Sequence, residues 1–507
     1  MLRLFACFSL CFFIISPSYA AAPNAEDALR LKQSLQKLLD MEKKLESTMS
    51  LGNLDIIYNG ELMVTPMDDY YAVETPDISI KGKDKDDKEK TVHFGKIAIN
   101  AIPSDKPGEW KMMASLPSTM NLADGALEVS LGKQLVAGLY NEKLGYFPKL
   151  NVQISDLGFK SKGEDTGLTI GQFKIVSNLE QDEQGALSGP GTVTATDIKF
   201  KSPKDKRDFS VGELSINMSF DKLQYPTIDE MLTKLDKYQG EIDALKTSNT
   251  DPAEVAKAQT QKLTEMISDL YLYDMNGISA SYAVKDVHLD NPDKDPTAVN
   301  LDSGHFGIDL AGMQSDDASF GLKIGFANLK VDAKNNDKAE AKLVPGDMDI
   351  SIKATKIPAV AIKTLASNSL KGVAANPDMA QIAIMGAVMK LPMMLSQSGT
   401  TVEIEKSFLK GGAYNAILQG NVTADMQAVT NVTAKIQGFL EGLDGLIELA
   451  GDTDAPENAI TNLTKLKEIG KQATSPNGNP AYSYEFVIAP DGTMTINGKN
   501  VMELSGK

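Results

Sequence analysis

The sequence predicts an α+β protein built on an extended, curved antiparallel β-sheet, with helices packed on it. Two observations predict this fold. Strand-like segments of alternating apolar and polar residues recur along the 507-residue chain, and amphipathic helical stripes precede, interrupt and follow them. We therefore expect repeated strand units with an N-terminal helix, a helical hairpin and C-terminal helices packed on the sheet.

The repeat is clearest between residues 154 and 220. Residues 156–161 recur as residues 197–202, residues 171–175 recur as residues 212–216, and every matched position differs by 41 residues. A fixed period is typical of units stacked side by side. Two divergent copies begin at Asp77 and Asp286. The recurring glycine marks either a bulge or the start of a strand.

Alternation at period two gives each strand unit one apolar side. Strand pairs of this kind are not stable alone in water, so we expect them to form a sheet with one wet face and one apolar face. The apolar face is either a core under the helices or, away from the helices, the floor of a groove. Six residues are candidates for a hydrophobic binding face: Phe159, Phe173, Phe200, Leu214, Met385 and Met389.

The first residues predict a secretory signal peptide. Arg3 precedes an apolar run of 12 residues, Leu4 to Ile15, and small residues follow at a cleavage site near residue 22. The run is shorter than the about 20 residues that cross a bilayer, so an uncleaved anchor is the weaker alternative. We expect a periplasmic or secreted protein without a transmembrane span.

Both cysteines, Cys7 and Cys11, lie inside this signal. Residues 23–507 therefore contain no thiol, which excludes disulfides, thiol nucleophiles and cysteine-ligated metals from them. The formal charge of −17 argues against a nucleic-acid partner, since phosphate binding needs a basic surface. The same charge disfavours broad electrostatic adsorption to anionic lipid.

Apolar stripes at helical spacing lie in two further regions. Leu31, Leu35 and Leu38 belong to an N-terminal helix that we expect to pack on the protein's own body. A second stripe begins at Ile228 and predicts two antiparallel helices, which either cover the sheet or form a partner-docking arm. The predicted regions are 1–22 (signal), 23–50 (N-terminal helix), 51–225 (repeated strands), 226–275 (helical hairpin), 276–358 (second strand region) and 359–507 (mixed helix and strand).

Residues capable of catalysis or metal binding do not form a recognisable motif. His93, His288 and His305 fall on polar alternation positions, so we expect them on the surface. The acidic clusters at 290–295 and 452–457 lack the spacing of a calcium loop. No zinc-hydrolase, nucleophile-elbow, phosphate-loop or dinucleotide pattern occurs. We predict no catalytic residues, no metal and no cofactor.

Met385, Met389 and Met393 recur every four residues, which aligns their thioethers on one helix face. Ordinary core packing is the preferred interpretation, because the neighbouring residues are also apolar and Pro392 interrupts the helix. An adaptable hydrophobic binding surface and a Cu(I) site are the alternatives.

A resemblance lies in the strand units, the segments 345–350 and 390–449, and the closing turn at 491–499. In these parts the chain resembles bacterial envelope proteins of the YdgA-like type and, more distantly, AsmA-type proteins. The resemblance implies no catalytic residues. AsmA-type proteins are associated with lipid traffic along a curved sheet with an apolar groove. We therefore expect a non-enzymatic envelope protein that binds lipid or another hydrophobic ligand. A structural or protein-interaction scaffold is the alternative, and the oligomeric state is left open.

Overall fold

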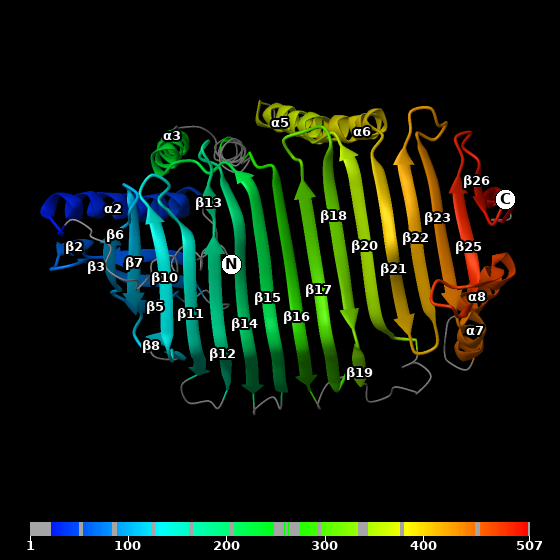
Figure 1. The fold of residues 1–507 in the computed structure, drawn as a ribbon, viewed down its shortest axis with the longest axis horizontal. Helices are drawn as coiled ribbons and strands as arrows, with labels where there is room; N and C mark the ends of the chain where they lie inside the picture. Colours follow the sequence, from blue (N-terminus) through cyan, green and yellow to red (C-terminus); the bar gives the residue numbers. More distant parts are fainter. Residues whose placement is uncertain are drawn as a thin grey trace. The chain divides into compact units, whose positions relative to one another are not determined.

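The computed structural model describes residues 22–49, 54–83, 89–122, 127–161, 166–202, 207–247, 258, 262, 274–291, 296–332, 343–375, 380–451 and 457–504. Among these residues, 24 strands belong to one antiparallel sheet that is not closed, and three belong to a second sheet. Helices occur near both ends of the described chain and between strands (Figure 1). The predicted α+β class with an antiparallel sheet is confirmed.

The chain divides into two compact units. The first consists of Met1–Lys204, Asn217–Met275 and Leu370–Ala380, and the second of Asp205–Ile216, Asn276–Ser369 and Gln381–Lys507. Strand β15 (Arg207–Leu223) and helix α5 (Ala359–Ala375) therefore each contribute to both units.

In the first unit, strands pair in the order β2–β3–β6–β7–β10–β11–β12–β14, β9 pairs with β8 and with the far half of β11, and β1–β4–β5 form the second sheet. Its elements are α2 (Ala25–Met49), β1 (Leu54–Asn59), β2 (Met63–Pro66), β3 (Tyr71–Glu74), β4 (Asp77–Lys83), β5 (Glu89–Gly95), β6 (Ala98–Pro103), β7 (Glu109–Ser115), β8 (Thr119–Leu122), β9 (Leu127–Ser130), β10 (Gln134–Asn141), β11 (Tyr146–Ser161), β12 (Gly167–Asn178), β13 (Glu180–Gln181), β14 (Leu187–Ser202) and α3 (Ile228–Thr247).

Helix α2 supplies much of the core of the first unit. It crosses the strands of this unit in Figure 1, and Leu31 and Leu35 are fully buried. The Ser34 hydroxyl lies 2.9 Å from the hydroxyl of buried Tyr140. Burial strongly raises the pKa of Tyr140. Each buried leucine contributes about 1.5–3 kcal/mol relative to exposure. The predicted packing of the N-terminal helix on the protein's own body is confirmed.

Helix α3 packs beside α2. A capping box opens it, in which the Thr227 N–H donates to the Glu230 carboxylate at 2.8 Å and the Glu230 N–H donates to the Thr227 hydroxyl at 3.3 Å. Its apolar stripe is buried, and an ion pair of 2.7 Å joins Lys37 of α2 to Asp229. Most of the predicted second helix of this hairpin lies outside the described residues.

The aspartate that opens three of the four copies has a left-handed backbone, with φ of 51° at Asp156 and 53° at both Asp197 and Asp286. Aspartate tolerates this conformation better than most residues. The Asp197 side chain lies over Gly171 of the adjacent strand, where an added Cβ would be 2.8 Å from the Asp197 Cβ. In the second unit, a Cβ at Gly212 would be 2.9 Å from that of Asp286. The recurring glycine therefore leaves room for the aspartate side chain of the adjacent strand. It marks neither a bulge nor the start of a strand.

The divergent copies depart from this arrangement. The copy at Asp77 lies in the separate sheet, where β4 and β5 shift register between Ile78 and Ser79. In the copy at Asp286, the register of β16 and β17 brings Asp302 rather than Gly304 opposite the aspartate. Asn328 (φ 53°) continues that row by donating from Nδ2 to the Asp302 carboxylate at 2.7 Å.

In the second unit, β16–β17–β18–β20–β21–β22–β23–β25–β26 are successive antiparallel neighbours. Its elements are β16 (Gly277–Asp290), β17 (Ala298–Ala311), β18 (Ala318–Ala327), β19 (Lys330–Asp332), β20 (Pro345–Ile357), α6 (Ala380–Ser398), β21 (Thr401–Gly411), β22 (Asn415–Ala424), β23 (Val432–Glu441), α7 (Leu443–Gly451), α8 (Glu457–Ile469), β24 (Lys471–Thr474), β25 (Pro480–Ile488), β26 (Met494–Ile496), β27 (Lys499–Asn500) and α9 (Val501–Leu504).

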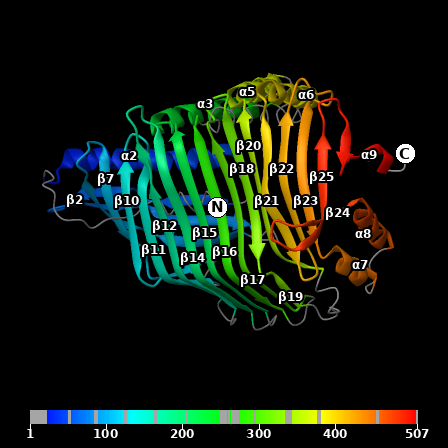
Figure 2. The ribbon, with the colours of Figure 1, turned by 45° about the vertical axis from the view of Figure 1, so that its right-hand side comes forward.

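Helix α6 lies beyond the ends of β20 and β21 rather than across a face of the sheet (Figures 1 and 2). The two strands pair directly, with Thr355 opposite Thr401. Residues 358–400 therefore connect two neighbouring strands. A hairpin loop of about 2–5 residues would be enough for such a connection.

Adding a methyl group at Gly171 should destabilise the first unit, because the new Cβ would collide with Asp197. We expect Gly171→Ala to lower the free energy of unfolding by about 1–3 kcal/mol, measured by urea denaturation. Gly191→Ala in β14 is the matched control, since the nearest atom to its Cβ would be 3.8 Å away. Asp197→Gly should restore part of the loss in Gly171→Ala. Equal effects of the two alanine variants would contradict the steric role.

Candidate hydrophobic binding surfaces

A continuous apolar face covers strands β16, β17, β18 and β20 of the second unit. In its central row, Tyr282 lies opposite Phe306, Phe306 opposite Ile324, and Ile324 opposite Ile350. Residues two apart on a strand share a face. The flanking rows are Ala280, Ile308, Leu322 and Ile352; Ile278, Leu310, Phe320 and Ala354; and Val284, Gly304, Phe326 and Met348. We call these four rows the apolar sheet face.

The opposite face of the same strands is polar or carries small residues. Residues such as Ser281, His305, Lys323 and Ser351 alternate with those of the apolar sheet face. The expected division into one wet and one apolar face is therefore present in this unit.

Leu214 extends the apolar sheet face on β15. The Lys285 ammonium lies 3.1 Å from the Glu213 carboxylate, and Gly212 faces Asp286. These two contacts set a register that brings Leu214 next to Val284. Leu214 is 37% exposed.

Side chains on the apolar sheet face are incompletely buried. Tyr282 is 43% exposed and Ile324 is 37% exposed. None of the large apolar residues in the four rows reaches full burial against the described part of the chain. Contiguous exposed apolar surface of this kind marks an interaction site more often than scattered single residues do.

Phe159, Phe173 and Phe200 behave differently, because they lie in the first unit. Phe173 pairs with Ile154 and Ala195, which are both buried, whereas Phe159 and Phe200 both pair with half-buried Leu168. Phe159 and Phe173 pack against the buried cluster that contains the α2 leucines. These two phenylalanines therefore belong to the core of the first unit, and not to a groove.

Helix α6 exposes most of its apolar side chains. Met385 is 56% exposed and Met389 is 74% exposed, so core packing, the preferred interpretation of the methionine spacing, is wrong for these residues. Ala387, Leu391 and Met394 lie on the half-buried side. The other exposed apolar residues of this helix are Ile382, Ile384, Val388 and Met393.

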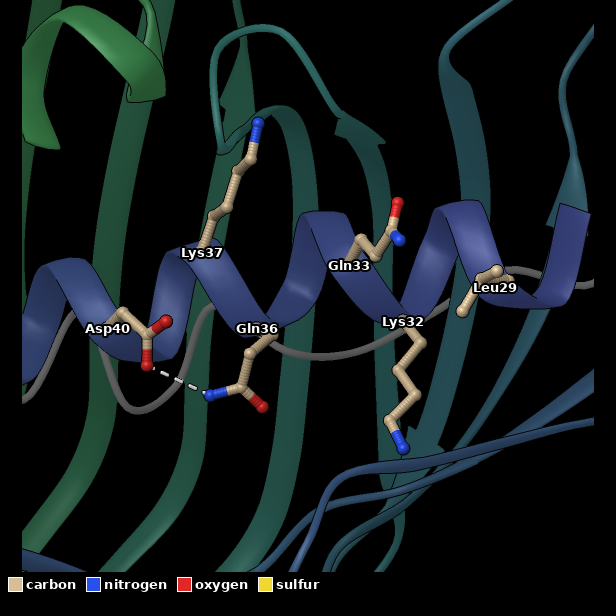
Figure 3. Close-up of a pocket in the computed structure, with 6 residues that line it drawn as sticks. All are labelled: Leu29, Lys32, Gln33, Gln36, Lys37 and Asp40. Carbon is tan, nitrogen blue, oxygen red and sulfur yellow. Dashed lines mark hydrogen bonds between the residues drawn. The ribbon is translucent and has the colours of Figure 1, made fainter.

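A depression of about 400 Å³ on the outer side of α2 does not form a ligand site. All six lining residues come from this one helix, among them Leu29, Lys32 and Asp40. In Figure 3 the Lys32 and Lys37 side chains point in opposite directions, and the Gln36 amide donates to Asp40 at 2.9 Å. No second element closes over these side chains in the view.

The three histidines are exposed, as predicted. His93 Nδ1 lies 3.0 Å from the Ser79 hydroxyl, His288 Nδ1 lies 2.6 Å from the Asn300 side-chain oxygen, and His305 Nε2 lies 3.7 Å from Asp349. Within the described ranges, no group of three or more histidine, cysteine or acidic residues is arranged to hold a metal ion.

The most heavily hydrogen-bonded carboxylate is that of Glu441, at the end of β23. Burial by itself raises its pKa, but four hydrogen bonds outweigh burial, so that the net pKa is lowered. The donors are the Ser475 hydroxyl at 2.5 Å and the side-chain amides of Asn415 at 3.1 Å, Asn479 at 3.1 Å and Asn477 at 3.4 Å. These hydrogen bonds hold the 475–479 turn against the end of β23. They also occupy the lone pairs of the Glu441 carboxylate.

No protein-family model matches the sequence, and no curated protein matches it. None of the helices in the described ranges is long and apolar enough to cross a membrane.

The sequence predicts the strands that carry Ile324 and Ile350, but it does not single out these two residues as site residues. Their signal was the same period-two alternation that marks core strands. Alternation identifies an apolar face, whereas its exposure depends on which distant segments pack against it.

Glu441→Gln should destabilise the second unit at neutral pH, because two of the four donors would then face the NH2 group of the glutamine. We expect a loss of about 1–3 kcal/mol. Because the folded pKa is lowered, the carboxylate contributes stability above its unfolded pKa and loses it as the pH falls through the folded pKa. The difference between variant and wild type should therefore shrink in acid, as measured by urea denaturation at several pH values. Glu485→Gln, which alters an exposed ion pair with Lys435 of 3.0 Å, should change little.

Proposed function

We propose that this protein is a non-enzymatic component of the extracytoplasmic envelope that binds lipid acyl chains, or a similar hydrophobic ligand, on the apolar sheet face. The observation that carries the proposal is the four-row apolar surface on β16, β17, β18 and β20, which stays partly exposed. An acyl chain suits such a surface because it is flexible, wholly apolar and longer than one strand spacing of about 4.8 Å.

Two sequence features support the location and the ligand class. The N-terminal apolar run predicts secretion. The resemblance to YdgA-like and AsmA-type proteins associates a sheet of this kind with lipid in the bacterial envelope. Neither feature assigns a catalytic residue.

A structural or protein-interaction scaffold is the alternative function. The docking arm considered for this role was the helical hairpin at 226–275. Met231, Leu235 and Tyr238 of its described helix, α3, are buried. The stripe of α3 therefore does not offer a docking face.

Lipids that co-purify with the secreted protein test the proposal most directly. We expect mass spectrometry of an organic extract to detect acyl lipids in a stable ratio to protein. The fluorescent fatty acid cis-parinaric acid should also bind the delipidated protein. Absence of both co-purified lipid and probe binding would remove the ligand and leave the scaffold function.

Substitutions on the two faces of one strand locate the ligand. Tyr282→Gln with Ile324→Gln should weaken cis-parinaric acid binding about ten-fold or more, because covering one large apolar side chain contributes about 1.5–3 kcal/mol. Lys323→Gln changes the neighbouring residue on the wet face and should leave the binding unchanged. Equal affinities of both variants would place the ligand elsewhere.

A further inference from the structure

Helix α6 combines a composition typical of buried helices with an exposed position. The segment from Ile382 to Met389 contains isoleucine, methionine, valine, alanine and glycine with no charged residue. A helix that is apolar around most of its circumference normally lies in a core or against a membrane. At 100° per residue, the exposed apolar side chains cover about half of the helix surface. These six residues, which we call the α6 patch, are Ile382, Ile384, Met385, Val388, Met389 and Met393.

Pairing of the sheet does not require this helix. β20 and β21 are hydrogen-bonded neighbours, and α5 and α6 lie in the connection between them. Long connections that a fold does not need usually carry a function. The contacts of α6 with its own unit involve its C-terminal turn, where the buried Ser396 hydroxyl lies 3.3 Å from the Asn431 carbonyl oxygen. The α6 patch begins before this turn.

Charge distinguishes the occupants that would cover the α6 patch. The segment 359–398 carries three lysines and one aspartate, within a chain of net charge −17. The side chain of Lys390, within α6, is exposed. Apolar residues beside a lysine match the surface of an anionic bilayer, where the alkyl stem extends to the headgroups. A second copy docked patch to patch would bring lysine against lysine, because residues 382–393 contain Lys390 and no acidic residue.

We propose that α6 docks this protein on anionic lipid bilayers by inserting the α6 patch into the headgroup region, with Lys390 facing the lipid phosphates. The docking is peripheral, and the rest of the acidic surface stays away from the bilayer. It goes beyond ligand binding on the apolar sheet face and does not depend on it.

Vesicle flotation with the complete secreted protein tests this docking. We expect binding to vesicles of phosphatidylcholine with phosphatidylglycerol, and weaker binding to phosphatidylcholine alone. Met385→Gln with Met389→Gln should reduce the partition coefficient at least ten-fold. Lys390→Gln should reduce it about five-fold at low salt, the effect of roughly one interfacial lysine. Higher salt should abolish the lysine effect and leave most of the methionine effect.

A matched control removes exposed methionines elsewhere. Met67→Gln with Met494→Gln replaces side chains that are 45% and 40% exposed and lie outside α5 and α6, and it should bind vesicles like the wild type. Absence of vesicle binding by the wild type, or equal loss in both double variants, would overturn the proposal. So would a wild-type dimer that Met385→Gln with Met389→Gln converts to monomer, because the patch would then bind a second copy.

Site-directed labelling tests insertion itself. Since residues 23–507 contain no cysteine, a single introduced cysteine can be labelled once the signal is removed, which intact mass checks. An environment-sensitive fluorophore at Met389→Cys should shift to shorter wavelength on anionic vesicles, whereas the same label at Glu468→Cys of α8 should not. No shift at residue 389 despite binding would overturn the proposal. The sheet variants Tyr282→Gln and Ile324→Gln should bind vesicles normally, so that loss of ligand binding and loss of docking are separable.

Discussion

Strand register is the constraint on which both units depend. Shifting a strand by one residue would move its whole apolar set to the other face. The aspartate–glycine contacts oppose such a shift. Gly171 lies opposite both Asp156 and Asp197 in the registers of its two neighbours, and Asp197 occupies the space that a Cβ at Gly171 would take. A slip would bring Gln172 or Ile170 into that position, where the side chain could not be accommodated.

The same alternation has different consequences in the two units. In the first unit, the buried leucines of α2 lie against the sheet, and Phe173 becomes part of a core. In the second unit, Tyr282 and Ile324 lie on strands that alternate in the same way, but their side chains remain partly exposed. A strand pattern thus determines which side of a sheet is apolar, and separate segments determine whether that side is a core or a surface.

This distinction explains what the sequence could and could not predict. The fold class, the repeated unit and the surface positions of the three histidines follow from local alternation and composition. Phe159 and Leu214 occupy similar strand patterns, yet the first packs against the α2 core and the second is 37% exposed. Phe159 packs against a buried cluster whose members come from strands and from α2. No local pattern encodes such distant contacts. The methionine spacing likewise identified a helix face, but not that the face is exposed.

Net charge and local charge lead to different expectations for membranes. A chain with a net charge of −17 should not adsorb broadly to anionic lipid. The Debye length of about 8 Å at physiological salt limits how far the acidic surface acts. A projecting helix with Lys390 among methionines therefore responds to charges near it, and not to the total. The acidic body would then oppose deeper engagement, which favours a reversible, orientation-specific contact at the helix.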